Sequence, residues 1–184
     1  MLPPIELDDE VLLRPIEAGD GAALAEAYAR NREHLAPWEP ARTSEFFTPR
    51  LQEREVAASL GRLAQGTAMP LVLVQRRPGG DDRIVGRVNL SDIVRGVFLN
   101  ANLGYWVDVE LQGRGLASAA VGAALHHAGT AGLHRVQAGT LVHNLASQRV
   151  LERNGFERIG FAPRYLRIAG EWRDHVLFQR LLED

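Results

Sequence analysis

Short apolar runs and helix-like segments follow one another in the first part of the chain. Val11 to Ile16 is apolar over the length of a strand, and Ala22 to Arg30 is rich in helix-forming residues. Asp20 stands just before that segment, where aspartate is a preferred helix cap. The prolines within His34 to Pro40 end the helical pattern. We therefore expect a strand, a capped helix and then a shaped loop.

The next segment predicts one amphipathic helix and a pair of strands. Leu51 to Leu63 has apolar residues at helical spacing, and Leu71 to Val74 is a short run that suits a buried strand. Arg77 to Asp82 contains Pro-Gly-Gly-Asp and predicts a turn, after which Ile84 to Ile93 forms the partner strand. The apolar face of the expected helix consists of Val56, Ala57, Leu60 and Leu63.

The second half begins with a strand, a tight turn and a long helix. Ala101 to Val109 is the expected strand, and Leu116 to Ala128 is a helix built from small residues. Gly132 closes that helix, and His134 to Val142 forms the following strand. This strand–turn–helix–strand order predicts that helices cover a sheet.

A short helix and two long strands finish the chain. Asn144 is the expected cap of the short helix, which ends near Asn154-Gly155, where glycine suits a left-handed conformation. The two strands are joined by a turn at Ala169-Gly170. Strands that surround a few helices predict an α/β (α+β) fold with a mixed sheet. A length of 184 residues fits one domain, residues 1–184, with a core over about 11–181.

The stretch from Leu103 to Ala117 carries the clearest chemical signal. It predicts an apolar strand, a glycine-containing turn and the start of a helix. Such a turn directs several backbone N–H groups and the positive end of the helix dipole at one point. Gly113 and Gly115 let the backbone bend and let a large anion approach closely. We interpret the stretch as a candidate diphosphate cradle.

Two common diphosphate motifs do not fit this turn. A P-loop requires a lysine, and the chain contains none, because all 21 basic residues are arginine. A dinucleotide fingerprint requires a third glycine and a later acid, but Ser118 takes the glycine position and Arg135 to Val142 contains no acid. A turn with a purely structural role remains open for the glycines alone.

Three motifs in order resemble the GNAT acyltransferases. Gln112-x-x-Gly115-x-Ala117 matches their (Gln/Arg)-x-x-Gly-x-(Gly/Ala) signature. Asn144 to Ser147, followed by Val150 to Phe156, is similar to their second landmark. Tyr165 to Phe178 resembles the RimJ/RimL branch, whose members acetylate the α-amino group of proteins, ribosomal proteins among them. The resemblance extends from about Leu12 to Leu181 and is strongest from Arg95 onward.

The resemblance implies the GNAT fold, a mixed sheet of about seven strands flanked by helices and splayed at the acyl-CoA site. It also implies acetyl-CoA as co-substrate, with the pyrophosphate in the cradle and the pantetheine arm along the exposed strand backbone. The cofactor-binding residues that follow from it are Val107, Val109, Gln112, Gly113, Arg114, Gly115, Leu116, Ala117, Ser118, Asn144 and Ser147. For Asn144, helix capping alone is an equal explanation. An exposed Arg114 is more often only solvated.

The resemblance also suggests catalytic groups. The N–H near Val107 would stabilise the oxyanion of the tetrahedral intermediate. Many members protonate the departing thiolate with a tyrosine at the position of Leu151, so we expect Ser147 to take that role. Glu110 is our candidate base, with Asp108 and His143 as further titratable neighbours, although Glu110 also fits a solvated turn. A glutamate of the RimL type has no counterpart here.

The acceptor pocket is expected to contain aromatic residues and an acid. The candidates are Trp38, Glu39, Tyr105, Trp106 and Tyr165, although aromatics near a cleft more often belong to the core. Glu39 suits an incoming ammonium. The favoured acceptor is a protein or peptide N-terminus. A small-molecule amine and a non-catalytic acyl-CoA sensor remain alternatives, since this fold changes acceptors through its loops.

Composition narrows the mechanism and the partners. Without lysine or cysteine, a covalent relay through either is excluded, and direct transfer to the amine is expected. The net charge of −2 argues against nucleic-acid partners. We expect no membrane span, no secretory signal and a cytoplasmic location, and a homodimer by resemblance. No metal site is expected, because His126 and His127 diverge on a helix and His134 and His175 suit packed positions in strands.

Overall fold

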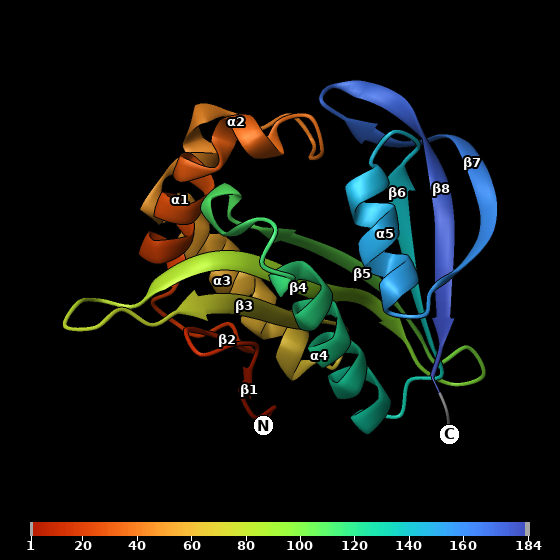
Figure 1. Cartoon of the computed structure of the whole chain (residues 1–184), viewed down its shortest axis with the longest axis horizontal. Coiled ribbons are helices and arrows are strands. Elements are labelled where there is room, and N and C mark those ends of the chain that lie inside the picture. Colours follow the sequence, from red (N-terminus) through yellow and green to blue (C-terminus); the bar gives the residue numbers. More distant parts are fainter. Residues whose placement is uncertain (1, 183–184) are drawn as a thin grey trace.

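The computed structural model describes residues 2–182 and contains one eight-stranded sheet (Figure 1). Its strand order is β1-β2-β3-β4-β5-β6-β8-β7, and every neighbouring pair is antiparallel except β5 with β6. The sheet therefore has one more strand than we expected, because β1 is a two-residue edge strand. The strands are β1 (Ile5–Glu6), β2 (Val11–Pro15), β3 (Met69–Gln75), β4 (Arg83–Val94), β5 (Asn100–Val107), β6 (Arg135–Leu141), β7 (Glu157–Ile168) and β8 (Glu171–Leu181).

The expected helices are present, and one short helix was not expected. That helix, α2, overlaps the start of the segment His34 to Pro40 that was expected to be a loop, and it ends before Pro37. The helices are α1 (Gly21–Arg30), α2 (Arg32–Leu35), α3 (Pro49–Ala64), α4 (Leu116–Thr130) and α5 (Leu145–Arg153), with 3₁₀ turns η1 (Ser44–Phe47) and η2 (Val109–Leu111). Among the described residues, no helix is long and apolar enough to span a bilayer.

The two faces of the sheet carry two separate hydrophobic cores. Leu71 and Leu73 pack on the face that α4 covers, whereas Val72 and Val74 pack with α1 and α3 on the other face. Because successive side chains of a strand point to opposite faces, one fully apolar strand serves both cores. Trp106 packs on the α1 face, and its neighbours Tyr105 and Val107 on the α4 face. Alternate residues of β5 therefore contribute to opposite faces of the sheet.

The sheet is open between β5 and β6. The two strands pair only from Asn100 to Asn102, opposite Arg135 to Gln137, although both continue beyond this segment. β5 stays paired with β4 as far as Val107, while β6 stays paired with β8 as far as Leu141. Figure 1 shows the two strands diverging, with α5 beside the gap. The splayed sheet that the resemblance implied is therefore confirmed.

Two expectations about helix α1 and helix α3 were wrong. Asp20 is the N-cap residue of α1, but its side chain makes no capping hydrogen bond, because its carboxylate instead accepts two hydrogen bonds at 2.8 Å from the Arg14 guanidinium. On α3, Ala57 is exposed, and the buried positions are Gln52, Val56 and Ser59. The face that packs on α1 therefore includes polar residues, which hydrophobicity alone does not reveal.

Candidate active site

The turn before α4 has the geometry of an anion cradle. Gly113 and Gly115 adopt φ values of +77° and +80°, a left-handed conformation that favours glycine. In the part of the chain that the structure describes, the backbone N–H groups from Gly113 to Ser118 donate to no other group. They lie at the N-terminus of a 15-residue helix, where the helix dipole adds positive potential. The turn therefore fits a diphosphate.

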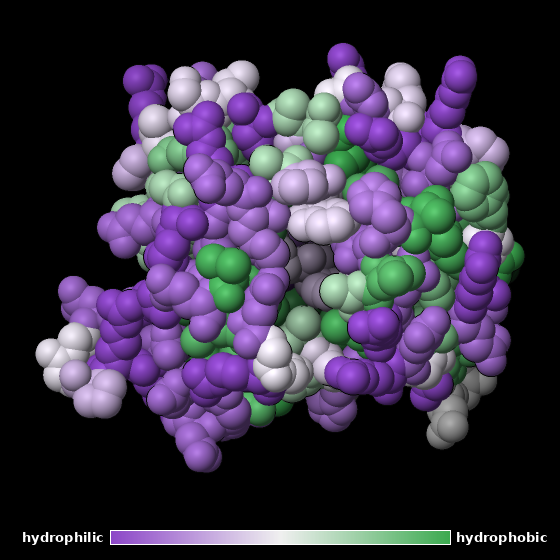
Figure 2. Space-filling model, turned by 45° about the horizontal axis from the view of Figure 1, so that its top comes forward, coloured by the Kyte–Doolittle hydropathy of each residue, from purple (hydrophilic) through white to green (hydrophobic). Residues whose placement is uncertain are grey.

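A groove of about 1280 Å³ leads from this cradle through the opening in the sheet. Its lining includes the turn from Gln112 to Ser118 apart from Arg114, residues of α5 from Ala146 to Arg153, and residues of β4 and α3 such as Asn89 and Ser59. Since α3 and α4 cover opposite faces, the groove connects the two faces of the molecule. Figure 2 shows a hollow near the middle of the surface, rimmed by both hydrophilic and hydrophobic residues.

Ser147 and Tyr105 meet on the α4 face of this groove. The Tyr105 hydroxyl lies 2.9 Å from the Ser147 hydroxyl, and it also donates to the Ser147 carbonyl oxygen at 3.2 Å. Burial raises the pKa of Tyr105 to about 12, and the bond to Ser147 lowers it only partly. Tyr105 therefore keeps its proton at neutral pH. The two hydroxyl groups are hydrogen bonded to each other, and both residues line the groove.

Asn144 has the structural role that capping predicted. Its side-chain oxygen accepts from the Ser147 N–H at 3.1 Å and so caps α5. Asn144 also lines the groove, and its amide nitrogen has no partner in the described part of the chain. Capping and a contact to a bound ligand are compatible, because they use different atoms of the side chain.

The Val107 N–H is directed at the opening between the strands. The next residue, Asp108, donates its own N–H to the Val85 carbonyl of β4 at 2.8 Å. N–H groups of successive strand residues point to opposite edges, so that of Val107 points away from β4. The β5 edge facing the gap has no strand partner at this position. The group is therefore available as a hydrogen-bond donor to a substrate.

Four of the expected site residues do not line the groove: Val109, Glu110, Arg114 and Tyr165. Arg114 pairs with Asp8 and Glu10 at 2.8 Å and 3.0 Å, so its charge is already balanced within the protein. Glu110 pairs with Arg83 at 2.9 Å on the surface, which does not fit the role of base. Tyr165 is 47% exposed.

The backbone of Val109 is also used internally. Its N–H donates to the Asn31 side-chain oxygen at 2.8 Å, because Val109 begins the turn η2 rather than extending β5. The neighbouring Asp108 is fully buried and hydrogen bonds to the Arg30 guanidinium at 2.7 Å. That pair fixes α1 to the end of β5. The Asp108 carboxylate is thus part of the fold and does not face the groove.

Trp38, Glu39 and Trp106 all line the groove. Trp106 is also a core residue, because its indole N–H donates to the Tyr28 hydroxyl at 3.3 Å. The Trp38 ring lies 5.5 Å from the ring of His143, across the gap between α2 and α5. Burial raises the pKa of Glu39 despite its 3.5 Å ion pair with Arg42.

His175 lines the groove, which the sequence did not indicate. It is 3% exposed and lies on β8 opposite Leu141. Its Nδ1 is 2.9 Å from the Arg173 carbonyl oxygen, which accepts only, so Nδ1 carries the proton and Nε2 is basic in the neutral ring. Only the strand order brings His175 to the groove; local spacing gives no sign of it. Within residues 2–182, no group of three or more His, Asp or Glu residues could hold a metal ion.

Comparison with known proteins agrees with this geometry. A family model described as an acetyltransferase (GNAT) domain matches residues 10–157. The [ribosomal protein uS5]-alanine N-acetyltransferase of Escherichia coli is 36% identical over 170 residues, which are 92% of this chain and 86% of that protein. The probable N-acetyltransferase YjcK of Bacillus subtilis is 30% identical, over 95% of each chain.

Solved structures give the same result. The ribosomal-protein-S5-alanine acetyltransferase of Vibrio fischeri aligns with a TM-score of 0.92 and 33% identity, over 99% of this chain and 98% of that one. Mycobacterium smegmatis RimJ in complex with CoA-disulfide aligns with a TM-score of 0.84 and 30% identity, over 93% of this chain and 81% of that one.

The chain therefore belongs to the GNAT acetyltransferase family, in its RimJ/RimL branch. It is an N-acetyltransferase that takes its acetyl group from acetyl-CoA. The residues present suit that co-substrate, because the unpaired N–H groups from Gly113 to Ser118 can hold the pyrophosphate and the open edge of β5 leaves room for the pantetheine arm.

Proposed function

We propose that this enzyme acetylates the N-terminal α-amine of a protein. The observation that carries the proposal is the groove, which continues past the opening in the sheet as far as Glu39 and the exposed Arg42. An acceptor can therefore approach from the face opposite the cradle, with a polypeptide chain trailing outside. The similarity to acetyltransferases named for a ribosomal-protein alanine supports the same acceptor class.

The transfer needs three groups around the thioester. The amine nitrogen forms a bond to the acetyl carbon, and the Val107 N–H stabilises the oxyanion. The carbon–sulfur bond then breaks; Ser147 gives a proton to the departing thiolate and takes one from the Tyr105 hydroxyl, and the resulting tyrosinate regains its proton from solvent before the next turnover. An N-terminal amine has a pKa near 8, so roughly a tenth of it is neutral at pH 7 and a larger fraction slightly above that pH, and only a weak base is needed.

We assign the role of base to His175. Its Nε2 is unprotonated in the neutral ring, because Nδ1 donates to the Arg173 carbonyl oxygen. The side chain lines the groove, whereas Glu110 and His143 do not. It accepts the proton that the amine loses after attack. Glu39, which lines the groove and pairs with Arg42, stays our candidate for attracting the ammonium form of the acceptor.

If the acceptor is a ribosomal protein, the reaction takes place in the cytoplasm. We therefore propose a cytoplasmic location for the enzyme. A homodimer stays a prediction. The cradle residues expected to bind acetyl-CoA are Gln112, Gly113, Gly115, Leu116, Ala117 and Ser118, all of which line the groove. Their proposed partner is the pyrophosphate, and that of Asn144 is the pantetheine arm.

Thiol release from acetyl-CoA tests the acceptor class. The panel contains short peptides with a free α-amine, the same peptides blocked at the N-terminus but carrying lysine, and a set of metabolite amines. We expect release only with the free α-amines. Release with metabolite amines alone would move the function to a small-molecule acceptor. Acetyl-CoA binding without release from any amine would contradict catalysis and indicate a sensor.

A further inference from the structure

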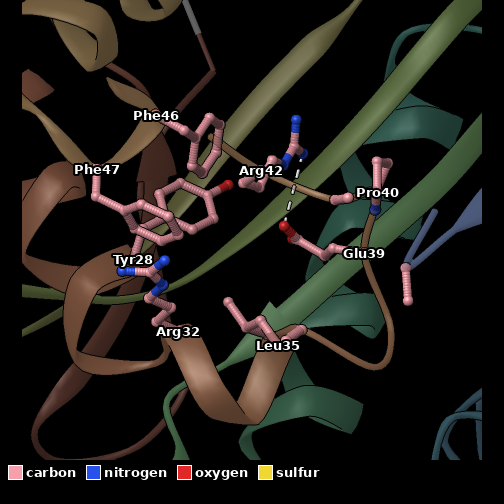
Figure 3. A pocket seen from close by; sticks show the side chains of 11 residues that line it. Tyr28, Arg32, Leu35, Glu39, Pro40, Arg42, Phe46 and Phe47 are labelled. Carbon is pink, nitrogen blue, oxygen red and sulfur yellow. Dashed lines mark ion pairs between the residues drawn. The ribbon is translucent and has the colours of Figure 1, made fainter. Parts of the chain in front are cut away.

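A second cavity opens beside the acceptor end of the groove. It measures about 290 Å³ and is enclosed by α1, α2, the following loop with η1, and the tip of the β7–β8 hairpin (Figure 3). We call it the aromatic pocket. The residues that decide its chemistry are Tyr28, Leu35, Glu39, Arg42, Phe46 and Phe47.

Three aromatic rings form one wall of the aromatic pocket. The Tyr28 and Phe46 rings meet edge to face with centroids 4.8 Å apart, and Phe46 and Phe47 do so at 5.4 Å. The guanidinium groups of Arg32 and Arg42 lie over the Phe47 and Phe46 rings, at 4.8 Å and 4.2 Å. Both charges are therefore already engaged, and the space between them is lined mainly by apolar surface (Figure 3).

The aromatic pocket is continuous with the groove. Tyr28, Leu35, Glu39 and Arg42 line both cavities. The Glu39 carboxylate pairs with Arg42 at 3.5 Å on their common border, as Figure 3 shows. The Glu39 carbonyl oxygen accepts from the Ala169 N–H at 2.9 Å, so the hairpin tip holds this border in place. A chain that enters the groove beside Glu39 and Arg42 therefore passes the mouth of the pocket.

We infer that the aromatic pocket binds an apolar side chain of the acceptor polypeptide, a few residues after the N-terminus that is acetylated. This inference rests on the proposed function. Pockets for whole small molecules measure about 300 to 1,000 Å³, so a cavity at the lower limit suits a single side chain. The pocket lies on the acceptor side of the groove, and the cradle lies at the N-terminus of α4 on the other face of the sheet.

The test is a series of peptides that share one N-terminal residue and differ only at positions two to four, where alanine is replaced by leucine in turn. We expect leucine at one of these positions to raise kcat/KM about tenfold over the alanine peptide. The Ala41→Phe variant fills the aromatic pocket, since Ala41 lines it, and is expected to treat both peptides alike.

The control variant is Ala57→Phe, which adds the same ring at an exposed position of α3 that lines neither cavity. It is expected to keep the preference for leucine. Acetyl-CoA binding, measured by calorimetry, shows whether each variant is folded. The cradle residues themselves are unchanged in both variants, so a folded variant should bind acetyl-CoA like the wild type. Equal kcat/KM for all free-amine peptides would overturn the inference that the aromatic pocket binds a side chain of the acceptor, and would leave the proposed function intact. No turnover of any free-amine peptide would overturn both.

Discussion

The Tyr105 hydroxyl lies 2.9 Å from the Ser147 hydroxyl, although the two residues are 42 positions apart in the chain. β5 supplies the tyrosine and α5 the serine, and both side chains reach the groove on one face of the sheet. Many family members are expected to carry a tyrosine that acts as general acid at the position of Leu151, which is fully buried here. The Tyr105 phenol thus lies near Ser147, but β5 supplies it, whereas Leu151 belongs to α5.

The hydroxyl pair predicts unequal effects of two substitutions. Ser147→Ala removes the group proposed to contact the thiolate, and we expect kcat to fall about 100-fold, within the usual range for a general acid. Tyr105→Phe leaves the serine in place and is expected to lower kcat by about tenfold. The measurement is steady-state turnover of a free-amine peptide at saturating acetyl-CoA.

The control for this pair is Thr130→Ala, which removes an exposed hydroxyl bonded only to the His126 carbonyl oxygen. It should leave kcat unchanged. Because the pKa of Tyr105 is raised to about 12, the wild-type pH profile should show no tyrosine ionisation below pH 10. Full activity of Ser147→Ala would remove Ser147 from the mechanism.

The sequence predicted most of the elements because their signals are local. The strand Leu71–Val74, the helix after Gly115 and the turn at Ala169-Gly170 follow from apolar runs, propensity and glycine. The GNAT resemblance located the cradle and Ser147. Residues whose role depends on tertiary contacts were not predictable in this way.

Asp20 shows why. Its position next to α1 suggested a cap, but an arginine from the preceding strand offers two stronger, charge-assisted bonds. His175 is the converse case, a residue that the pattern assigned to packing. It reaches the groove because β8, and not β7, lies next to β6, and strand order is not encoded in local periodicity.

Gly115 is expected to be essential for binding acetyl-CoA. Gly115→Asp places a carboxylate where the pyrophosphate is proposed to lie, and we expect Kd to rise by at least 100-fold in calorimetry. Gly132→Asp is the matched control. Both glycines have a left-handed φ, and a Cβ added to either meets no atom within 4 Å, so the backbone strain is similar. Unchanged affinity in Gly115→Asp would show that the cradle lies elsewhere.

Two substitutions of Asn144 should distinguish its role as helix cap from its proposed role in binding acetyl-CoA. Asn144→Ala removes the cap of α5 and is expected to reduce the free energy of unfolding by about 1 kcal/mol. Asn144→Asp keeps an oxygen for the Ser147 N–H but loses the amide donor. We expect this variant to retain stability in urea unfolding while its KM for acetyl-CoA rises several-fold. If KM stays at the wild-type value, Asn144 acts as a cap only.

His127 is expected to make the fold sensitive to acid. It is 2% exposed, and burial, followed by the neighbouring His126, lowers its pKa. The unfolded chain therefore binds a proton near pH 6.5 while the folded chain does not, so stability is present above that pH and decreases as the pH falls. Between pH 7.5 and 5.5 this one group lowers the free energy of unfolding by up to about 1.4 kcal/mol.

The measurement for His127 is urea unfolding at the two pH values. His127→Leu should lose this part of the pH dependence, since an apolar side chain of similar size remains in the core. His126→Leu, at the exposed neighbouring position, should retain it. Equal pH dependence in the wild type and His127→Leu would show that burial does not control this histidine.

His175 should take part in the proton transfer itself. His175→Gln preserves a polar side chain on β8 but cannot accept the proton, so we expect kcat to fall by about 100-fold. The remaining rate should rise with pH, because a larger fraction of the amine is then neutral without help from the protein. KM for acetyl-CoA should change little, since the cradle is on the other face of the sheet.

A merely structural role of His175 predicts a different pattern. Loss of its bond to the Arg173 carbonyl oxygen would then lower stability and leave the pH profile of kcat unchanged in shape. Urea unfolding of the same variant distinguishes the two cases. Glu110→Gln is the parallel test of the surface acid, and its ion pair with Arg83 predicts an unaltered kcat. A large loss in Glu110→Gln together with normal turnover in His175→Gln would assign the base to Glu110.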